Sequence, residues 1–386
     1  MAQINQARLQ KYPSVSDLRQ RAKNRLPLIA WEYLDMGTGE DVALSRNRTS
    51  LDRVTLLPKF LKGEQTQNTE TTLFGRTYNL PFGVAPVGLT GLIWPNAEQI
   101  LAKTAAQYRF PYCLSTAATQ TPETIGPLLN NMGWFQLYPP RDEHICDDLL
   151  QRARDNGFHT LVVTADVPAA SRRERTARAG LRMPPSITPY FIWQAARYPA
   201  WAIATLRHGI PRLRTVEKYA DATDIRNAAR FVGERFGGTL SWEYLKRVRD
   251  IWDGPIVLKG LMHPDDAEMA ISIGIEGIGV SNHGARQFDG SPGAIELLPK
   301  IAKQVNSRAQ IIFDSGIRSG LDVIRALSLG ADFVLAGRAF MFGVAAFGAD
   351  GGVHVAEILQ ADLKTNMAQL GVTTIEEIKQ LVPSAD

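Results

Sequence analysis

The 386-residue chain is long enough for one large domain or two small ones, and with 45% apolar and 21% charged residues it has an ordinary globular composition. Its two cysteines, Cys113 and Cys146, provide neither a disulfide framework nor a metal-ligand cluster, so no metal site is expected. A polar N-terminus and the lack of about 18 consecutive apolar residues argue against a signal segment or a spanning helix, which favours a cytoplasmic location.

The net charge of +4 is concentrated in one segment. Residues 172–214 contain nine arginines and a single acidic residue, Glu174, so the rest of the chain is acidic overall. Basicity confined to one segment argues against a general nucleic-acid-binding surface, and no nucleic-acid partner is expected.

Short apolar runs alternate with amphipathic stretches from residue 79 onward. The predicted strands are Pro81–Ala85, Tyr112–Ser115, Trp134–Tyr138, Thr160–Thr164, Pro255–Lys259, Gly277–Ser281, Gln310–Asp314 and Asp332–Ala336. The predicted helices between them include Asn96–Tyr108, Glu143–Asn156, Trp242–Trp252, Asp265–Ile273, Ile295–Val305 and Gly320–Leu329. Eight strand–helix units predict an α/β fold, a closed (β/α)8 TIM barrel. The alternative is an open doubly wound sheet, which the absence of Gly-x-Gly-x-x-Gly after the first strand disfavours.

Two regions lie outside this repeat. Residues 1–78 are predicted to be an N-terminal helical segment packing on the barrel, with helix around Val15–Leu34, and residues 79–386 form the barrel. Residues 167–240 form an insertion after the fourth strand that is too long for a simple βα loop.

Polar residues stand at the carboxyl ends of nearly all predicted strands, where chemistry gathers in a barrel of this kind. The most informative group is Ser281–Gln287, which follows a buried strand and contains His283 and Arg286. The arginine can hold a carboxylate through two parallel N–H bonds, and the histidine can accept a proton. This pairing suits chemistry on a 2-hydroxy acid.

The ends of the last two predicted strands have the composition of a phosphate site. They contain Asp314, Ser315, Gly316, Ile317 and Arg318, followed by Gly337 and Arg338. Glycines let the backbone approach an anion, and the loops after strands seven and eight are the usual phosphate position in this fold. A phosphorylated cofactor or substrate is therefore expected.

Together these residues resemble the family of FMN-dependent 2-hydroxy-acid dehydrogenases and oxidases, over almost the whole chain from Leu26 to Ile378. Ser281–Gln287 is the signature, and the supporting matches are Trp134–Tyr138, Ile256–Gly260 and Asp314–Arg318. The resemblance implies FMN as cofactor and a homo-oligomer, since such barrels are often tetramers. Within the family the chain is most similar to the (S)-mandelate and respiratory L-lactate dehydrogenases, through Gly88-Leu89-Thr90-Gly91 and Trp94-Pro95.

The resemblance also implies roles for individual residues. His283 would be the catalytic base and Asp166 the carboxylate that orients it, and the substrate ligands would be Arg286, Arg173, Tyr33 and Tyr138. Lys259 would be the cation near flavin N1. The flavin contacts would be Pro86, Val87, Gly88, Ser115, Gln136, Thr164 and Ser281, while the residues of the phosphate group described above would hold the ribityl chain and phosphate.

The expected reaction converts an (S)-2-hydroxy acid, lactate- or mandelate-like, to the 2-oxo acid. With a base on one side and flavin N5 as hydride acceptor on the other, proton and hydride leave together; a carbanion route uses the same residues, and the sequence leaves both open. Ala117 replaces a tryptophan of glycolate oxidases, which leaves room for a larger substrate side chain. Gly88 is alanine in the oxidases, a difference linked to slow reaction of reduced flavin with oxygen.

Electrons are therefore expected to pass to a quinone or another carrier. Two alternatives stay open: an oxidase that uses O2 and releases H2O2, and a flavin-binding barrel that does not catalyse. Two interpretations also stay open for residues 181–214, which combine arginines with Tyr190, Trp193, Tyr198 and Trp201. This composition suits a peripheral contact with the inner face of the cell membrane; the alternative is a lid over the active site.

Overall fold

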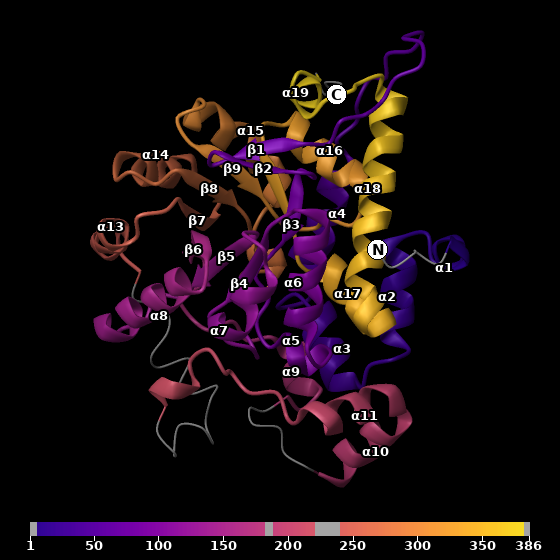
Figure 1. Ribbon diagram of the computed structural model, residues 1–386, viewed down its shortest axis with the longest axis vertical. Helices are drawn as coiled ribbons and strands as arrows, with labels where there is room; N and C mark the ends of the chain where they lie inside the picture. Colours follow the sequence, from indigo (N-terminus) through magenta and orange to yellow (C-terminus); the bar gives the residue numbers. More distant parts are fainter. Residues whose placement is uncertain (1–5, 182–187, 221–239, 382–386) are drawn as a thin grey trace.

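The computed structural model describes residues 6–181, 188–220 and 240–381 (Figure 1). Eight parallel strands close into a barrel in the order β10-β3-β4-β5-β6-β7-β8-β9. Their bounds are β3 Phe82–Val84, β4 Tyr112–Ser115, β5 Gly133–Leu137, β6 Phe158–Thr164, β7 Ile256–Leu261, β8 Gly277–Val280, β9 Gln310–Phe313 and β10 Phe333–Ala336. Each predicted strand overlaps one of these, and the predicted (β/α)8 barrel is confirmed.

The strands read as short apolar runs because both of their faces are buried. Inside the barrel, Trp134, Val257, Phe333 and their neighbours form a compact apolar cluster. A hairpin of β1 (Thr71–Leu73) and β2 (Arg76–Tyr78) covers one end of this cluster, and the indole N–H of Trp134 donates to the Tyr78 hydroxyl over 3.2 Å. With this end closed, the opposite end is left for a ligand.

Helices surround the barrel, as the predicted strand–helix alternation requires (Figure 1). They are α5 Thr90–Ile93, α6 Ala97–Tyr108, α7 Pro122–Ile125, α8 Glu143–Asp155, α13 Trp242–Ile251, α14 Pro264–Ser272, α15 Ala294–Val305, α16 Gly320–Ser328, α17 Arg338–Phe347, α18 Gly351–Leu370 and α19 Ile375–Lys379. Helices α17 and α18 together are long and apolar enough to cross a membrane, but 78% of their most apolar window is buried inside the protein. They turn at Gly348, whose φ is 61°, and pack against each other as core helices.

The N-terminal segment contains α1 Gln6–Lys11, α2 Val15–Lys23, α3 Leu28–Asp35 and α4 Val42–Asp52. The stretch predicted to be helical around Val15–Leu34 contains two helices, α2 and α3, with a break between them. Pro27 stands at the break with extended backbone, as expected for a residue that cannot donate a helical hydrogen bond. Helix α3 reaches the barrel end where the insertion also lies.

The insertion contributes α9 Glu174–Arg178, α10 Pro189–Arg197, α11 Pro199–His208 and the short turn Glu217–Tyr219. Residues 182–187 and 221–239, parts of the predicted insertion and membrane segment, lie outside the described residues. Figure 1 places α10 and α11 at the end of the molecule away from β1 and β2. Buried Trp201 of α11 donates its indole N–H to the carbonyl of Leu92 in α5 over 3.1 Å, so α11 is attached directly to the barrel end.

Candidate active site

A cavity of about 630 Å³ lies at the carboxyl ends of the strands. Every barrel strand contributes to its wall through its last residues or the loop that follows, and Tyr33 of α3 and Leu213 of the insertion complete it. All predicted site residues line this cavity except Asp166, Ser115, Gln136 and Ser281. Each of these four contacts a residue that does: Asp166 contacts His283, Ser115 contacts Ala117, Gln136 contacts Thr164 and Ser281 contacts Lys259.

His283 and Asp166 form a hydrogen-bonded pair at the cavity wall. Nδ1 of His283 lies 2.7 Å from Oδ1 of Asp166, and both side chains are largely buried. Burial by itself would raise the pKa of Asp166, but the charge and hydrogen bond of His283 and the charge of Lys259 outweigh it and lower that pKa. An ionised carboxylate only accepts hydrogen bonds, so the proton of the neutral imidazole resides on Nδ1. Nε2 is then the nitrogen that can accept a proton.

The Asp166 side chain packs against the backbone of β7 at a position that only glycine can occupy. Gly260 has a φ of 105° and sits where the β7–β8 register shifts, and a Cβ at this position would lie 2.5 Å from Cγ of Asp166. The carboxylate is therefore packed directly against this bulge, and its Oδ2 is buried with no hydrogen-bond partner among the described residues. The pair Lys259-Gly260 in the sequence is the signal for this bulge, although the pattern alone did not connect it to Asp166.

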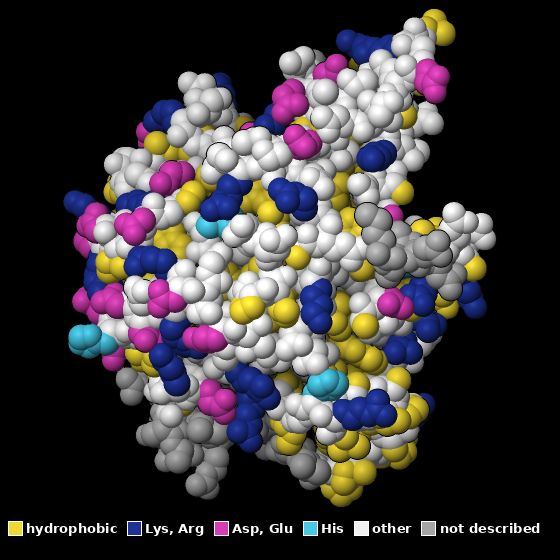
Figure 2. Space-filling view, viewed as in Figure 1, with side chains coloured by type: hydrophobic (Ala, Val, Ile, Leu, Met, Phe, Trp, Pro, Cys, Tyr) yellow, Lys and Arg dark blue, Asp and Glu magenta, His cyan; other side chains and the backbone are white. Residues whose placement is uncertain are grey.

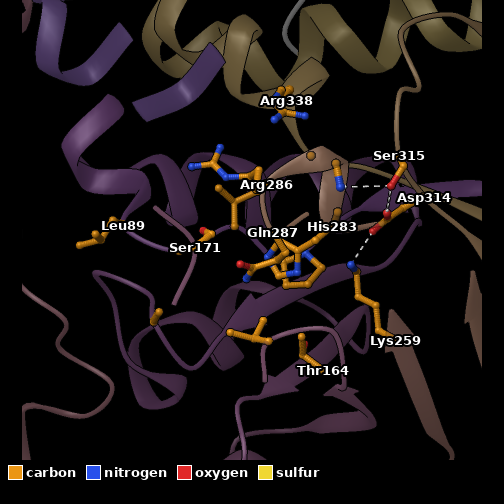
Figure 3. Close-up of a pocket in the computed structure, with 18 of the residues that line it drawn as sticks. Leu89, Thr164, Ser171, Lys259, His283, Arg286, Gln287, Asp314, Ser315 and Arg338 are labelled. Atoms are coloured by element: carbon orange, nitrogen blue, oxygen red, sulfur yellow. Dashed lines mark hydrogen bonds and ion pairs between the residues drawn. The ribbon is translucent and has the colours of Figure 1, made fainter. Parts of the chain in front are cut away.

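Lys259, Ser281 and Asp314 form a buried polar chain beside this pair. Nζ of Lys259 donates to the Ser281 hydroxyl over 3.0 Å and forms an ion pair with Oδ2 of Asp314 over 2.8 Å. The hydroxyl groups of Ser281 and Ser315 both donate to the same Asp314 carboxylate. Burial opposes the charge of Lys259, but Asp314 and Asp166 together raise its pKa above the usual value. A permanent cation therefore lies at the cavity wall, and Figure 3 shows it pointing towards Asp314 and Ser315.

Two arginines from different strand ends enter the same cavity. The Arg286 guanidinium donates to the backbone carbonyl of Tyr33 over 2.9 Å and lies 4.9 Å from the centre of its ring. Nε of Arg173 donates to the Ser171 hydroxyl over 2.9 Å. Burial, with the nearby charge of Arg173, lowers the pKa of Arg286 to about 9. Neither arginine has a carboxylate ion-pair partner in the described part of the chain, so this end of the cavity favours an anionic ligand.

Arg318 and Arg338 form a second cationic group at the end of β9 and the start of α17. Arg338 donates to the carbonyls of Leu34 and Met36, and Arg318 donates to its neighbour Ile317 over 3.0 Å. Burial lowers the pKa of Arg318 to about 10 and that of Arg338 to about 9. Their charges are met mainly by carbonyl groups, and a bound phosphate would stabilise both of them. The residues present thus fit a ligand such as FMN, with a phosphate at this end.

Tyr138 lines the cavity near Arg173 and Arg286, and burial raises its pKa to about 12, so its hydroxyl stays protonated. Apolar side chains form another part of the wall: Leu89, Ile93, Ala117, Val167, Pro168 and Leu213. Leu213, Ser171 and Arg141 were not predicted, and no periodic signal marks them. No group of three or more His, Cys, Asp or Glu side chains placed to hold a metal ion occurs among the described residues.

Comparison with known proteins agrees with this geometry. The model of the FMN-dependent dehydrogenase family matches residues 22–383. A solved structure of the monotopic membrane protein (S)-mandelate dehydrogenase is 30% identical, with 96% of this chain and 99% of that chain covered and a TM-score of 0.90. Mandelate oxidase is 33% identical, with coverage of 96% and 98% and a TM-score of 0.82. A structure of mandelate oxidase with benzoyl-formic acid is 34% identical, with coverage of 96% and 98% and a TM-score of 0.81.

Proposed function

Since this chain belongs to the FMN-dependent dehydrogenase family, we propose that it oxidises an (S)-2-hydroxy acid with a bulky apolar side chain to the 2-oxo acid and passes the electrons to a carrier other than oxygen. FMN is its cofactor and its reaction class is 2-hydroxy-acid oxidation. The observation that carries the finer proposal is the convergence of the His283–Asp166 pair and two arginines on one cavity.

In this proposal Arg286 and Arg173 bind the substrate carboxylate. Two guanidinium groups in a largely buried site gain a charge-assisted partner when the carboxylate arrives, which offsets the burial of Arg286. The hydroxyl of Tyr138, protonated over the whole working pH range, donates to the substrate, and the Tyr33 ring lies against the Arg286 guanidinium. The carboxylate is thereby fixed in one orientation relative to His283.

His283 acts as the base. Asp166 holds the proton on Nδ1, so the basic Nε2 is available to the substrate, and the carboxylate stabilises the imidazolium that forms when Nε2 takes a proton. Lys259, held by Asp314 and Ser281, places a fixed positive charge on the same side of the cavity. This charge stabilises negative charge that develops during the oxidation.

The cofactor would be held by three groups of residues. Pro86, Val87 and Gly88, with the hydrogen-bonded series Ser115, Gln136 and Thr164, would contact its ring system. The residues from Asp314 to Arg318, with Gly337 and Arg338, would hold the ribityl chain and phosphate. When bound, FMN supplies the two-electron acceptor of the oxidation.

The apolar wall supports an aromatic or branched substrate side chain. Ala117, Leu89, Ile93 and Leu213 line the cavity, and none of them offers a hydrogen-bonding side chain. Similar solved structures include mandelate oxidase with (S)-mandelic acid, so a phenyl-bearing acid is the first substrate to test.

Reaction with oxygen is the second candidate, because mandelate oxidases are among the similar structures. Gly88 supports the dehydrogenase, because the family resemblance places glycine at this position in the dehydrogenases and alanine in the oxidases. Its carbonyl accepts the Tyr33 hydroxyl over 3.0 Å, and a Cβ at Gly88 would lie 3.1 Å from Cβ of Ala117, which is a tight contact. The glycine thus leaves this part of the wall without a side chain.

The α10–α11 surface supports a peripheral membrane contact. Tyr190, Ile192, Trp193, Ile203 and Leu206 are exposed there, and Figure 2 shows apolar side chains gathered at this end of the molecule with basic ones beside them. The Arg197 guanidinium lies 4.8 Å from a ring of Trp193. Exposed apolar side chains flanked by arginines suit the interface of an anionic bilayer. We therefore propose that the protein binds to the inner face of the membrane, where a quinone in the bilayer could accept its electrons.

The function is tested by anaerobic reduction of the purified, FMN-loaded protein. (S)-Mandelate, L-lactate and glycolate are mixed with it in turn while the visible flavin absorbance is followed, and air is then admitted. We expect fast bleaching by (S)-mandelate and slow recovery in air. Fast recovery with release of peroxide would identify an oxidase, and no bleaching by any 2-hydroxy acid would contradict the proposed function.

A further inference from the structure

The short helix α9 begins immediately after Arg173, and its Arg175 contacts the N-terminal segment. Arg175 reaches three carboxylates: its Nε donates to Glu32, one terminal nitrogen lies 2.6 Å from Oδ2 of Asp41, and the other lies 3.3 Å from Oδ2 of Asp35. The side chain of Arg175 is 25% exposed, and those of Glu32, Asp35 and Asp41 are 17%, 7% and 22% exposed. Ion pairs of this burial are screened less by solvent than surface pairs.

The residues on both sides of Arg175 attach α9 to the same segment. Glu174 accepts the backbone N–H of Gly39 over 2.9 Å. The Thr176 hydroxyl donates to the carbonyl of Arg173 over 2.7 Å and also contacts the sulfur of Met36. Three consecutive side chains therefore fix the start of α9. The strongest of these attachments is the clamp that Arg175 forms with Glu32, Asp35 and Asp41.

Arg173 itself has a strained backbone, with a φ of 47° in the left-handed region. A residue with a long side chain keeps this conformation only when its surroundings over-determine it. The attachments of α9 lie directly after Arg173 and provide that restraint. Without the clamp, Arg173 would be free to relax to an ordinary backbone conformation, and its side chain would leave its place at the cavity wall.

The segment that receives the clamp also positions two other arginines of the site, Arg286 and Arg338. Arg286 donates to the carbonyl of Tyr33, and Arg338 donates to the carbonyls of Leu34 and Met36. The C-terminal end of α3 thus holds the guanidinium groups of both Arg286 and Arg338. Two arginines that share one carboxylate must keep a fixed separation, because a misplaced donor loses its hydrogen bond.

We propose that Arg175 is a positioning residue for substrate binding, which holds Arg173 in the cavity by clamping α9 to Glu32, Asp35 and Asp41. This inference rests on the proposed function, in which Arg173 binds the substrate carboxylate. Arg175 does not line the cavity, so it cannot contact the substrate itself and must act through another residue, which the proposal identifies as Arg173.

The test compares Arg175→Gln with a matched control, Arg178→Gln, which removes an exposed arginine from the same helix. Both are purified with FMN, and flavin affinity, KM and kcat are measured with (S)-mandelate. Because an interaction made equally in ground and transition states affects KM alone, we expect Arg175→Gln to raise KM by about 10-fold or more and to change kcat less than about 3-fold. FMN affinity should be unchanged, and Arg178→Gln should behave as the wild type.

A purely structural role is separated by repeating Arg175→Gln in an Arg173→Met background. If Arg175 acts through Arg173, the second substitution should add no further rise in KM. An equal rise in both backgrounds, or a parallel loss of FMN, would overturn the proposal. Should Arg175→Gln fail to fold, Asp41→Asn removes one carboxylate of the clamp instead. Its effect on KM is then measured in the wild-type and Arg173→Met backgrounds.

The proposed function and this inference fail in different ways. A wild-type protein that no 2-hydroxy acid reduces contradicts the function. A wild-type protein that is reduced, with an Arg175→Gln variant of unchanged KM, contradicts only the positioning role.

Discussion

Nδ1 of His283 lies 2.7 Å from Oδ1 of Asp166, although 117 positions separate the two residues in the chain. They follow β8 and β6, so strand β7 lies between their strands, and Gly260 at the end of β7 leaves the space through which the side chains meet. The pair fixes one tautomer of the imidazole, and its chemical consequences can be tested on each partner separately.

Replacement of His283 by glutamine should abolish reduction of the flavin by substrate while leaving the cofactor bound. Loss of a positioned general base costs about 10²- to 10⁴-fold in rate. The measurement is the anaerobic rate of flavin bleaching at saturating (S)-mandelate. A retained visible spectrum serves as the control for folding, and a variant reduced at the wild-type rate would rule out His283 as the base.

Asp166→Asn tests whether Asp166 holds the His283 imidazole in the tautomer with its proton on Nδ1. An amide can donate to Nδ1 as well as accept from it, so the imidazole is no longer held with its proton on Nδ1, and the imidazolium loses its charged partner. We expect a fall in kcat of about 10²-fold or more, with KM changed much less. If the variant keeps the wild-type kcat, Asp166 does not orient the base.

Ala117→Trp should reduce the space that the cavity offers to the substrate side chain. Ala117 lines the cavity beside Gly88, and an indole there would fill space that a substrate side chain otherwise occupies. The ratio of kcat/KM for (S)-mandelate to that for glycolate should fall by about 10-fold or more, since a pocket that is too small by several carbon atoms loses a few kcal/mol of binding. An unchanged ratio would place the substrate side chain elsewhere. Ala118→Ser, at a buried neighbour outside the cavity lining, is the control.

Ile192→Ser combined with Trp193→Ser should weaken binding to anionic lipid vesicles. Both side chains are more than half exposed on α10, and each large apolar side chain moved into a bilayer interface contributes roughly 1.5 kcal/mol or more, which is about 10-fold in affinity. The measurement is co-sedimentation at low and high salt. Leu61→Ser removes another exposed apolar side chain, outside the insertion, and should have no effect.

Point substitutions are preferable to deletion of residues 181–214 in that experiment. Leu213 lines the cavity, and Trp201 is buried against α5, so a deletion would damage the candidate active site as well as the surface. Vesicle binding that survives the double substitution would favour the lid interpretation of the insertion.

His159 should make the protein sensitive to acid. Burial, with the charge of Arg76, lowers the pKa of His159 to about 4, and its Nε2 is buried with no partner in the described structure. Between pH 6.5 and pH 4 the unfolded chain therefore binds a proton that the folded protein does not, so the free energy of unfolding falls as the pH decreases through this window. The loss is at most about 3 kcal/mol.

Urea denaturation near pH 7 and near pH 4.5 checks this prediction. His159→Gln removes the titrating group, so the stability difference between the two pH values should be smaller in the variant than in the wild type. An equal difference in both proteins would assign the acid sensitivity to other groups.

Much of the fold could be predicted from the sequence because its signals are local. Eight apolar runs separated by amphipathic stretches predicted the closed barrel, and the helical pattern around Val15–Leu34 did not specify where α2 ends and α3 begins. Most predicted site residues line the cavity, since the carboxyl ends of parallel strands in a closed barrel must meet at one end. Leu213 could not be predicted, because its place depends on how the insertion folds back over that end.

The sequence by itself determined which chemical groups the protein has at its strand ends: a base, a carboxylate, a buried lysine and two pairs of arginines. Periodicity and motif spacing carry that information, because each strand end is specified by a few neighbouring residues. Only the tertiary structure decided how these groups are held. The Gly260 bulge beside Asp166, the carbonyls of Tyr33, Leu34 and Met36 that receive Arg286 and Arg338, and the Arg175 clamp all join segments far apart in the chain. Such contacts depend on the docking of non-repeating segments onto the barrel, and no local pattern of residues encodes that docking.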